Sequence, residues 1–138
     1  MTEPSAERRI VYADSSALVK LVIDEPESRE LERHLGSKPV LATSRIALVE
    51  VTRATRIASS GPDVARDTAA LLAGCMLVDA SDRVLRDAIE LTSPSVRTLD
   101  AMHLASALRV EADEFLAYDR RLLSAASAAG LEIASPGA

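Results

Sequence analysis

The sequence predicts an α/β fold with a mainly parallel sheet covered by helices on both faces. Short β-rich runs alternate with longer stretches of helical spacing along the whole chain. Neighbouring parallel strands need crossover connections, and a helix normally supplies them. Ligands of such open sheets bind beyond the carboxyl ends of the strands. Functional side chains are therefore expected at that edge.

Five strands are expected where the β-rich runs recur, and they cover residues 10–13, 40–43, 76–78, 115–118 and 131–133. Seven helices are expected where apolar residues recur with helical spacing, and they cover residues 16–23, 27–35, 45–58, 64–73, 83–91, 99–110 and 120–129. Ser44, Ser81 and Thr98 precede or begin three of these helices. Each has a side-chain oxygen that can accept hydrogen bonds from the free backbone N–H groups of a first helical turn.

The length of 138 residues suits one domain, which can bury roughly two-thirds of its unfolded surface without disulfides. The single cysteine, Cys75, lies in an apolar stretch and is expected to be a small core residue in a reducing cytoplasm. Residues 1–9 and 135–138 carry no periodic apolar signal, so both ends are expected to be mobile. The folded domain is expected to span residues 10–134.

The net charge of −5 argues against bulk electrostatic attraction to nucleic acid or to an anionic membrane. Three aromatic residues and no tryptophan leave little surface on which bases could stack. The longest uncharged apolar run, 69–78, is far shorter than the ~20 residues of a membrane span. We therefore expect a cytoplasmic protein that holds any polyanion through local arginines or bridging metal ions.

Four acidic residues are expected to meet at the functional edge of the sheet. Asp14 ends the first predicted strand and Asp119 ends the fourth, so both face the same edge. Asp100 lies in the opening turn of its helix, and Glu50 lies one to two turns into another helix that follows a strand. Sequence intervals of 36, 50 and 19 positions (50−14, 100−50, 119−100) separate them.

Such a cluster needs protons or cations, because two carboxylates at ~4 Å repel by about 4 kcal/mol at the dielectric of a protein surface. Oxygen ligands suit the hard cations Mg²⁺ and Mn²⁺, and the sequence lacks the Cys/His spacing of a closed zinc site. These ions can activate a water for in-line attack on a phosphodiester and stabilise the leaving oxygen.

Each acid also has a purely structural interpretation. Asp14 can be a turn residue at a strand end, Asp119 a helix N-cap, and Asp100 a carboxylate at the positive end of its helix dipole. Glu50 can pair with Arg53, one turn further along its helix.

Histidine and basic residues near the acids have two interpretations. His103 lies on an apolar helix and is more often a satisfied core residue than a general base. Five basic residues could contact substrate phosphates or instead form ion pairs and a solvated face, and they are Lys20, Arg53, Arg97, Arg120 and Arg121.

Four sequence blocks together resemble the PIN-domain family, specifically the VapC-type toxins of toxin–antitoxin (VapBC) pairs. The blocks are residues 12–21, 48–54, 99–108 and 115–122, in the order found in the family. The resemblance runs from about residue 10 to residue 134. It implies a PIN-like three-layer fold with a central parallel sheet.

The resemblance also implies an endoribonuclease that cuts RNA with Mg²⁺ or Mn²⁺, pairs as a homodimer and is silenced by a cognate VapB-type antitoxin. Carried over by position, the metal-binding acids are Asp14, Glu50, Asp100 and Asp119, and Ser16 is the hydroxyl residue beside the first. Many relatives have Ser or Thr two positions before the last acid, where this chain has Ala117. A polar contact beside Asp119 is therefore expected to be missing here.

Two other functions remain open from the sequence. One is a catalytically silent PIN-fold module that sequesters a protein or RNA partner. The other is phosphate-ester hydrolysis through an aspartyl nucleophile at Asp14, although Ser16 stands where that chemistry needs a second acid.

Overall fold

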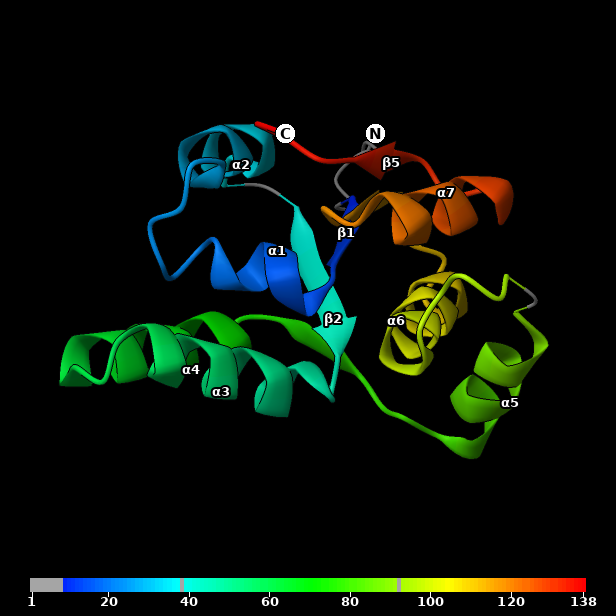
Figure 1. The fold of residues 1–138 in the computed structure, drawn as a ribbon, viewed down its shortest axis with the longest axis horizontal. Helices are drawn as coiled ribbons and strands as arrows, with labels where there is room; N and C mark the ends of the chain where they lie inside the picture. The colour runs from blue at the N-terminus through cyan, green and yellow to red at the C-terminus, as the bar shows by residue number, and fades with distance from the viewer. Residues whose placement is uncertain (1–8, 38, 92) are drawn as a thin grey trace, which may run out of the picture.

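A computed structural model describes residues 9–37, 39–91 and 93–138, and it confirms the predicted α/β class (Figure 1). Five parallel strands form one sheet in the order β3-β2-β1-β4-β5. The strands are β1 (Ile10–Ala13), β2 (Val40–Ser44), β3 (Met76–Val78), β4 (Glu114–Leu116) and β5 (Ile133–Ala134). The central strand β1 is also the first in the chain.

Seven helices surround this sheet in the described part of the chain. They are α1 (Ser15–Val19), α2 (Ser28–Leu35), α3 (Ala47–Ala58), α4 (Pro62–Ala73), α5 (Asp82–Glu90), α6 (Thr98–Arg109) and α7 (Arg120–Ala128). Buried residues of α1 to α4 pack on one face of the sheet, and those of α5 to α7 pack on the other. The result is the expected three-layer arrangement.

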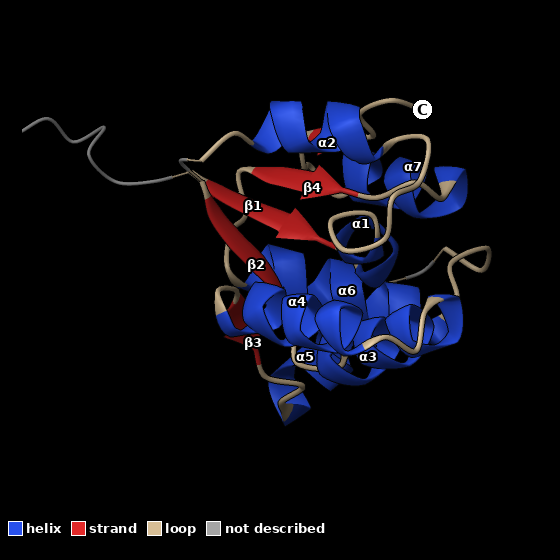
Figure 2. Cartoon of the chain, turned by 90° about the vertical axis from the view of Figure 1, so that its left-hand side faces the viewer, coloured by secondary structure: helices blue, strands red, loops and turns tan. Residues whose placement is uncertain are grey.

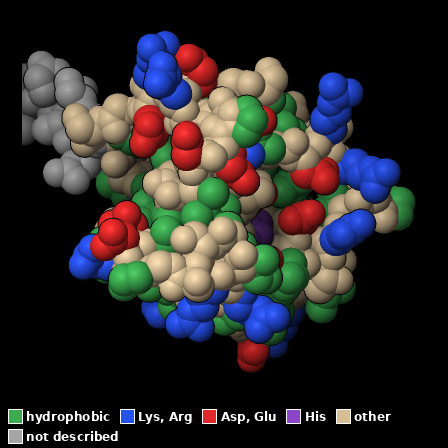
Figure 3. Space-filling view, turned by 60° about the vertical axis from the view of Figure 1, so that its left-hand side comes forward, with side chains coloured by type: hydrophobic (Ala, Val, Ile, Leu, Met, Phe, Trp, Pro, Cys, Tyr) green, Lys and Arg blue, Asp and Glu red, His purple; other side chains and the backbone are tan. Residues whose placement is uncertain are grey.

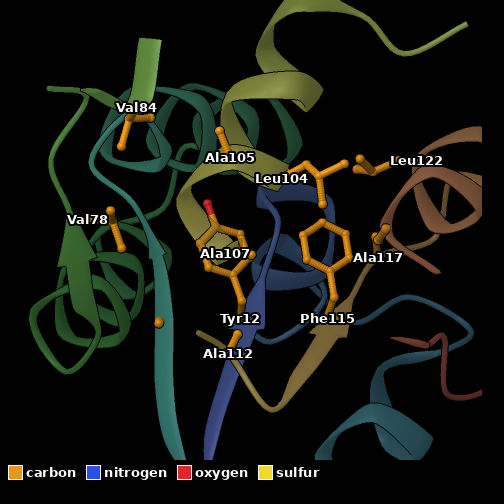
Figure 4. Packing of buried hydrophobic residues seen from close by; sticks show 12 residues of the cluster. Tyr12, Val78, Val84, Leu104, Ala105, Ala107, Ala112, Phe115, Ala117 and Leu122 are labelled. Carbon is orange, nitrogen blue, oxygen red and sulfur yellow. The ribbon is translucent and has the colours of Figure 1, made fainter. Parts of the chain in front are cut away.

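Successive residues of β1 point to opposite layers, as strand geometry requires. Val11 and Ala13 enter the core beneath α1 to α4, whereas Tyr12 enters the core beneath α6 and α7. The ring of Tyr12 stacks on Phe115 of β4, with centroids 5.6 Å apart, and its oxygen points toward α6 (Figure 4). The two layers therefore meet through the middle strand.

The carboxyl ends of the parallel strands lie at one edge, where the arrowheads of β1 and β4 end beside α1 (Figure 2). Asp14 follows β1 at this edge, and its backbone N–H donates to the carbonyl of Leu116 at 3.1 Å. The topology thus places the predicted functional edge next to α1, α3 and α6.

Several predicted boundaries differ from the structure. Strand β4 ends at Leu116 rather than 118, and β5 lies at 133–134 rather than 131–133. Helix α1 ends at Val19 and the chain continues in turns, with bonds such as Leu21 N to Leu18 O at 3.0 Å. Local turn bonding therefore ends a helix that apolar spacing alone extends to residue 23.

The predicted caps are confirmed in one case of three. Ser81 is the N-cap of α5, and its hydroxyl accepts from Val84 N. The prediction that Thr98 caps α6 was wrong, because Arg97 occupies the N-cap position and Thr98 is the first residue of the helix. Ser44 accepts from Ile46 N at 3.2 Å, but Ile46 holds the N-cap position of α3.

The prediction that both ends of the chain are mobile has a different outcome at each end. The predicted mobile segment 1–9 lies outside the described residues, except for Arg9. The other end makes contacts that the sequence does not predict: Tyr118 Oη donates to the carbonyl of Pro136 at 2.8 Å. Gly137 has a φ of +84°, and a Cβ there would lie 3.1 Å from Cα of Glu27. Only glycine fits this close approach to α2 without strain.

No helix within the described ranges is both long and apolar enough to cross a membrane.

Candidate active site

Asp14 is a buried carboxylate at the start of α1. Its side chain is the N-cap of the helix: Oδ1 accepts from Ala17 N at 3.0 Å and from the Ser16 hydroxyl at 2.8 Å. The residue is only 5% exposed. Asp14 is therefore a helix N-cap and not the turn residue of the structural interpretation, and the neighbouring hydroxyl of Ser16 contacts it. Oδ2 accepts no hydrogen bond from the described residues, so it is available to a ligand.

Glu50 lies in the first turn of α3 and is held by two donors. Its Oε1 accepts from the Ser15 hydroxyl at 2.5 Å and pairs with His103 Nε2 at 2.8 Å. The proposed pairing of Glu50 with Arg53 was wrong, because its carboxylate is hydrogen-bonded to Ser15 of α1 and His103 of α6 instead. Burial raises the pKa of Glu50, but the hydrogen bonds from His103 and Ser15 outweigh it and leave the pKa below its usual value.

Asp100 lies in the first turn of α6, which is consistent with the helix-dipole interpretation. Burial raises the pKa of Asp100 most, and the negative charges of Asp119 and Glu50 raise it further, while His103 and Arg97 oppose the rise. Burial likewise raises the pKa of Asp14, and Asp100 adds to that rise. The four acids thus act on one another electrostatically at one edge of the sheet.

Asp119 is exposed and caps α7, as the structural interpretation predicts. Its Oδ1 accepts from Arg121 N at 2.8 Å and Leu122 N at 3.1 Å. Ala117 is fully buried on the core side, where it supplies no hydroxyl. One oxygen of Asp119 is therefore committed to the helix, and the other can face a ligand.

The basic candidates divide into two groups. Lys20 Nζ pairs with Glu25 at 3.1 Å and Glu27 at 3.0 Å, and it lies 4.7 Å from the centre of the Tyr118 ring. These contacts give Lys20 a structural role. The other four are exposed arginines, and they are Arg53, Arg97, Arg120 and Arg121.

Three further residues of the site were missed as participants. Tyr12 Oη lies 2.7 Å from His103 Nδ1, and Ser15 lies beside His103 Nε2 at 3.2 Å as well as bonding Glu50. The core interpretation of His103 is confirmed by its burial, yet its ring reaches the site. The only available signal was position: His103 stands three residues after Asp100, on the same helix face.

The space-filling view shows acidic side chains gathered about a hollow in which a histidine is visible, with Lys and Arg side chains toward the rim (Figure 3). Among the described residues, no three His, Cys, Asp or Glu side chains are arranged to hold one ion. The four acids, together called the acidic pocket, therefore influence one another electrostatically without forming a preformed coordination shell. Their oxygens suit a hard cation such as Mg²⁺, which keeps several of its waters.

A PIN domain model matches residues 11–128. The matched segment includes helices from both faces of the sheet and all four acids. The chain belongs to the PIN-domain family. PIN nucleases are metal-dependent hydrolases, and the oxygen ligands of this pocket fit that chemistry.

Similar proteins place this PIN domain among the VapC ribonucleases. Ribonuclease VapC46 of Mycobacterium tuberculosis is 38% identical over 128 residues, covering 91% of this chain and 97% of the relative. Ribonuclease VapC47 of the same species is 38% identical over 136 residues, covering 94% and 98%.

Solved structures confirm the PIN-like fold. Mycobacterium tuberculosis VapC20, described as a sarcin-ricin loop cleaving toxin, has a TM-score of 0.71 at 21% identity, covering 91% of this chain and 99% of that one. A toxin–antitoxin complex from Klebsiella pneumoniae has a TM-score of 0.68 at 16% identity, covering 91% and 97%.

Proposed function

We propose that this PIN domain is an Mg²⁺- or Mn²⁺-dependent endoribonuclease that hydrolyses RNA phosphodiester bonds in the cytoplasm and acts as a toxin. One observation carries the proposal. Asp14 and Asp100 are 86 positions apart in sequence (100−14), yet burial raises the pKa of both carboxyls. The charge of Asp100 adds to the rise at Asp14, and the charges of Asp119 and Glu50 add to the rise at Asp100. Carboxylates kept together at such a cost are typical of a cation site.

Four carboxylates would hold the metal: Asp14, Glu50, Asp100 and Asp119. A bound Mg²⁺ or Mn²⁺ supplies an activated water and charge stabilisation at the leaving oxygen. Ser16 orients Asp14 through its hydrogen bond to Oδ1, which leaves Oδ2 for the ligand. The capping bonds of Asp119 similarly direct its free oxygen away from the first turn of α7.

The test is RNA cleavage by purified protein with Mg²⁺ or Mn²⁺, in the presence and absence of a chelator. Asp14→Asn and Asp100→Asn should each lower the rate by at least about 100-fold, since each removes a charged ligand. Asp63→Asn is the matched control, because Asp63 is an exposed carboxylate on α4. Cleavage that survives the chelator or both site variants would rule out the metal mechanism.

We also infer a VapB-type antitoxin partner and a homodimeric state. The solved neighbours include the Klebsiella pneumoniae toxin–antitoxin complex and VapBC2 of Rickettsia felis bound to a DNA fragment from the VapBC2 promoter. Co-expression with the neighbouring open reading frame, followed by gel filtration, tests both inferences. Separate elution of the two proteins, or a monomeric mass for the toxin alone, would count against them.

A catalytically silent binding module is the second candidate, and the buried Ala117 favours it, since it provides no hydroxyl beside Asp119. Calorimetry distinguishes the two. Partner binding without uptake of Mn²⁺ would favour the silent module over the nuclease.

A further inference from the structure

A buried chain of hydrogen bonds links the core to the acidic pocket. Tyr12 on β1 lies 2.7 Å from His103 Nδ1 on α6, and Nε2 of the same ring lies 2.8 Å from Glu50 Oε1 on α3. Tyr12 is 0% exposed and His103 is 1% exposed. The chain of hydrogen bonds therefore joins three elements from both layers of the fold, and it runs from the fully buried Tyr12 and His103 to the partly exposed Glu50.

The partners of His103 determine which ring nitrogen carries the proton. A carboxylate only accepts hydrogen bonds, so the Nε2 that faces Glu50 must carry a proton. In the neutral ring Nδ1 then accepts, and the phenol of Tyr12 donates to it. The Tyr12 hydroxyl thus favours the tautomer that can donate to Glu50.

The same contacts restrict the orientation of Glu50. A free glutamate side chain loses rotamer entropy when it is fixed in one conformation. Here the donors Ser15 and His103 both bind Oε1, so this ordering happens within the folded protein. Oε2 accepts no hydrogen bond from the described residues and remains for a ligand. A His103 that only filled the core would need no partner in the pocket.

We propose that His103, held by Tyr12, is a positioning residue that presents Glu50 to the metal, an inference that rests on the proposed nuclease function. The proton of Nε2 fixes one carboxylate oxygen and directs the other to the cation. Tyr12 acts one step further back, by keeping that proton on Nε2.

The first measurement is Mn²⁺ affinity by titration calorimetry. His103→Phe keeps a ring but removes both hydrogen bonds, and it should weaken Mn²⁺ binding about 10–100-fold, as loss of groups that orient ligands does. His103→Gln, which retains a donor at the end of its side chain, should recover most of that loss. Tyr12→Phe should weaken binding less than His103→Phe does.

Thr68→Val is the control for a general loss of stability. Thr68 is buried on α4, and its hydroxyl bonds Thr55 at 3.0 Å, away from the pocket. This variant should lose stability with Mn²⁺ affinity unchanged within about 2-fold. A His103→Phe protein that binds Mn²⁺ as tightly as the wild type, or a Thr68→Val protein that loses as much affinity, would overturn the proposal.

The second measurement needs no metal and separates this proposal from the proposed function. Nitrogen NMR of the His103 ring should show the proton on Nε2 in the wild type, and in Tyr12→Phe the Nδ1-protonated form should increase. A wild-type ring with Nδ1 protonated and Nε2 bare would overturn the positioning role. Failure of the wild type to take up Mn²⁺ would instead contradict the nuclease function, whatever the tautomer.

Discussion

Asp14 has opposite effects on stability and on function. Its carboxylate is buried beside the charge of Asp100, so ionisation is harder in the folded protein than in the unfolded chain. A raised pKa means that the folded state keeps its proton to higher pH than the unfolded state. The free energy of unfolding therefore falls as pH rises from the ordinary Asp pKa through the raised one.

Asp14→Asn should therefore raise stability at neutral pH, while it lowers the rate of RNA cleavage by at least about 100-fold. Asparagine is as good an N-cap as aspartate, so the bond from Ala17 N can persist without the charge. Urea denaturation of metal-free protein at several pH values would measure the difference between variant and wild type. That difference should increase with pH across the stated window.

The opposite trend in the same series, with the variant losing stability as pH rises, would show that the charge of Asp14 is favoured in the fold. Asp63→Asn, which removes an exposed carboxylate on α4, is the control variant in this series.

Residue roles were predictable from sequence where partners are close along the chain. Asp14 and Ser16 are two positions apart, and their hydrogen bond follows from a helix starting directly after a strand. The contacts of Glu50 with Ser15 and His103 span 35 and 53 positions, and that of Tyr12 with His103 spans 91. Such pairs depend on how layers stack, which apolar periodicity does not encode.

At the level of single elements, α7 allows the two roles of Asp119 to be separated. Asp119→Ala removes both the cap and the charge, and it should lower the free energy of unfolding by about 1 kcal/mol. Asp119→Ser keeps a capping oxygen and should preserve stability. If Asp119 also binds metal, both variants should lose RNA cleavage, and urea denaturation beside an activity assay checks this.

If Asp119→Ser cleaves RNA normally, Asp119 serves only as the N-cap of α7 and is not a metal ligand. That result would agree with the absence of a hydroxyl at Ala117.

Lys20 joins α1 to the beginning of α2. Its side chain is 13% exposed, with two carboxylate partners and the face of Tyr118. Lys20→Met should lower the free energy of unfolding by about 1–2 kcal/mol through the lost ion pairs and the cation–π contact. Urea denaturation measures this. A higher KM for RNA with unchanged stability would instead support a phosphate-binding role.

Element type was predicted throughout the described chain, but boundaries were less predictable. Residues Ala117 and Tyr118 carry a strand-like pattern, yet they leave the sheet because β5 begins opposite Phe115 and ends opposite Leu116. The end of a strand is set by its neighbour's length, and that length is not local information.

For the molecule as a whole, a cation that binds the folded pocket should stabilise it by mass action. At a free concentration of 100 times Kd, Mg²⁺ or Mn²⁺ adds about 2.7 kcal/mol to the free energy of unfolding. Thermal unfolding should show a concentration-dependent rise in Tm that a chelator reverses. An equal rise in the Asp14→Asn, Asp100→Asn double variant would place the binding elsewhere.

The position of β1 at the centre of the sheet has a consequence for synthesis on the ribosome. One side of β1 pairs early with β2, but on the other side Val11 pairs in register with Glu114, 103 positions later (114−11). That side of the middle strand therefore stays unpaired until most of the chain is translated. Nascent chains stalled before residue 114 should show weaker protease protection of β1 than the full-length chain. A nuclease built in this order cannot complete its sheet, or the acidic site that includes Asp119, until the final quarter of the chain emerges.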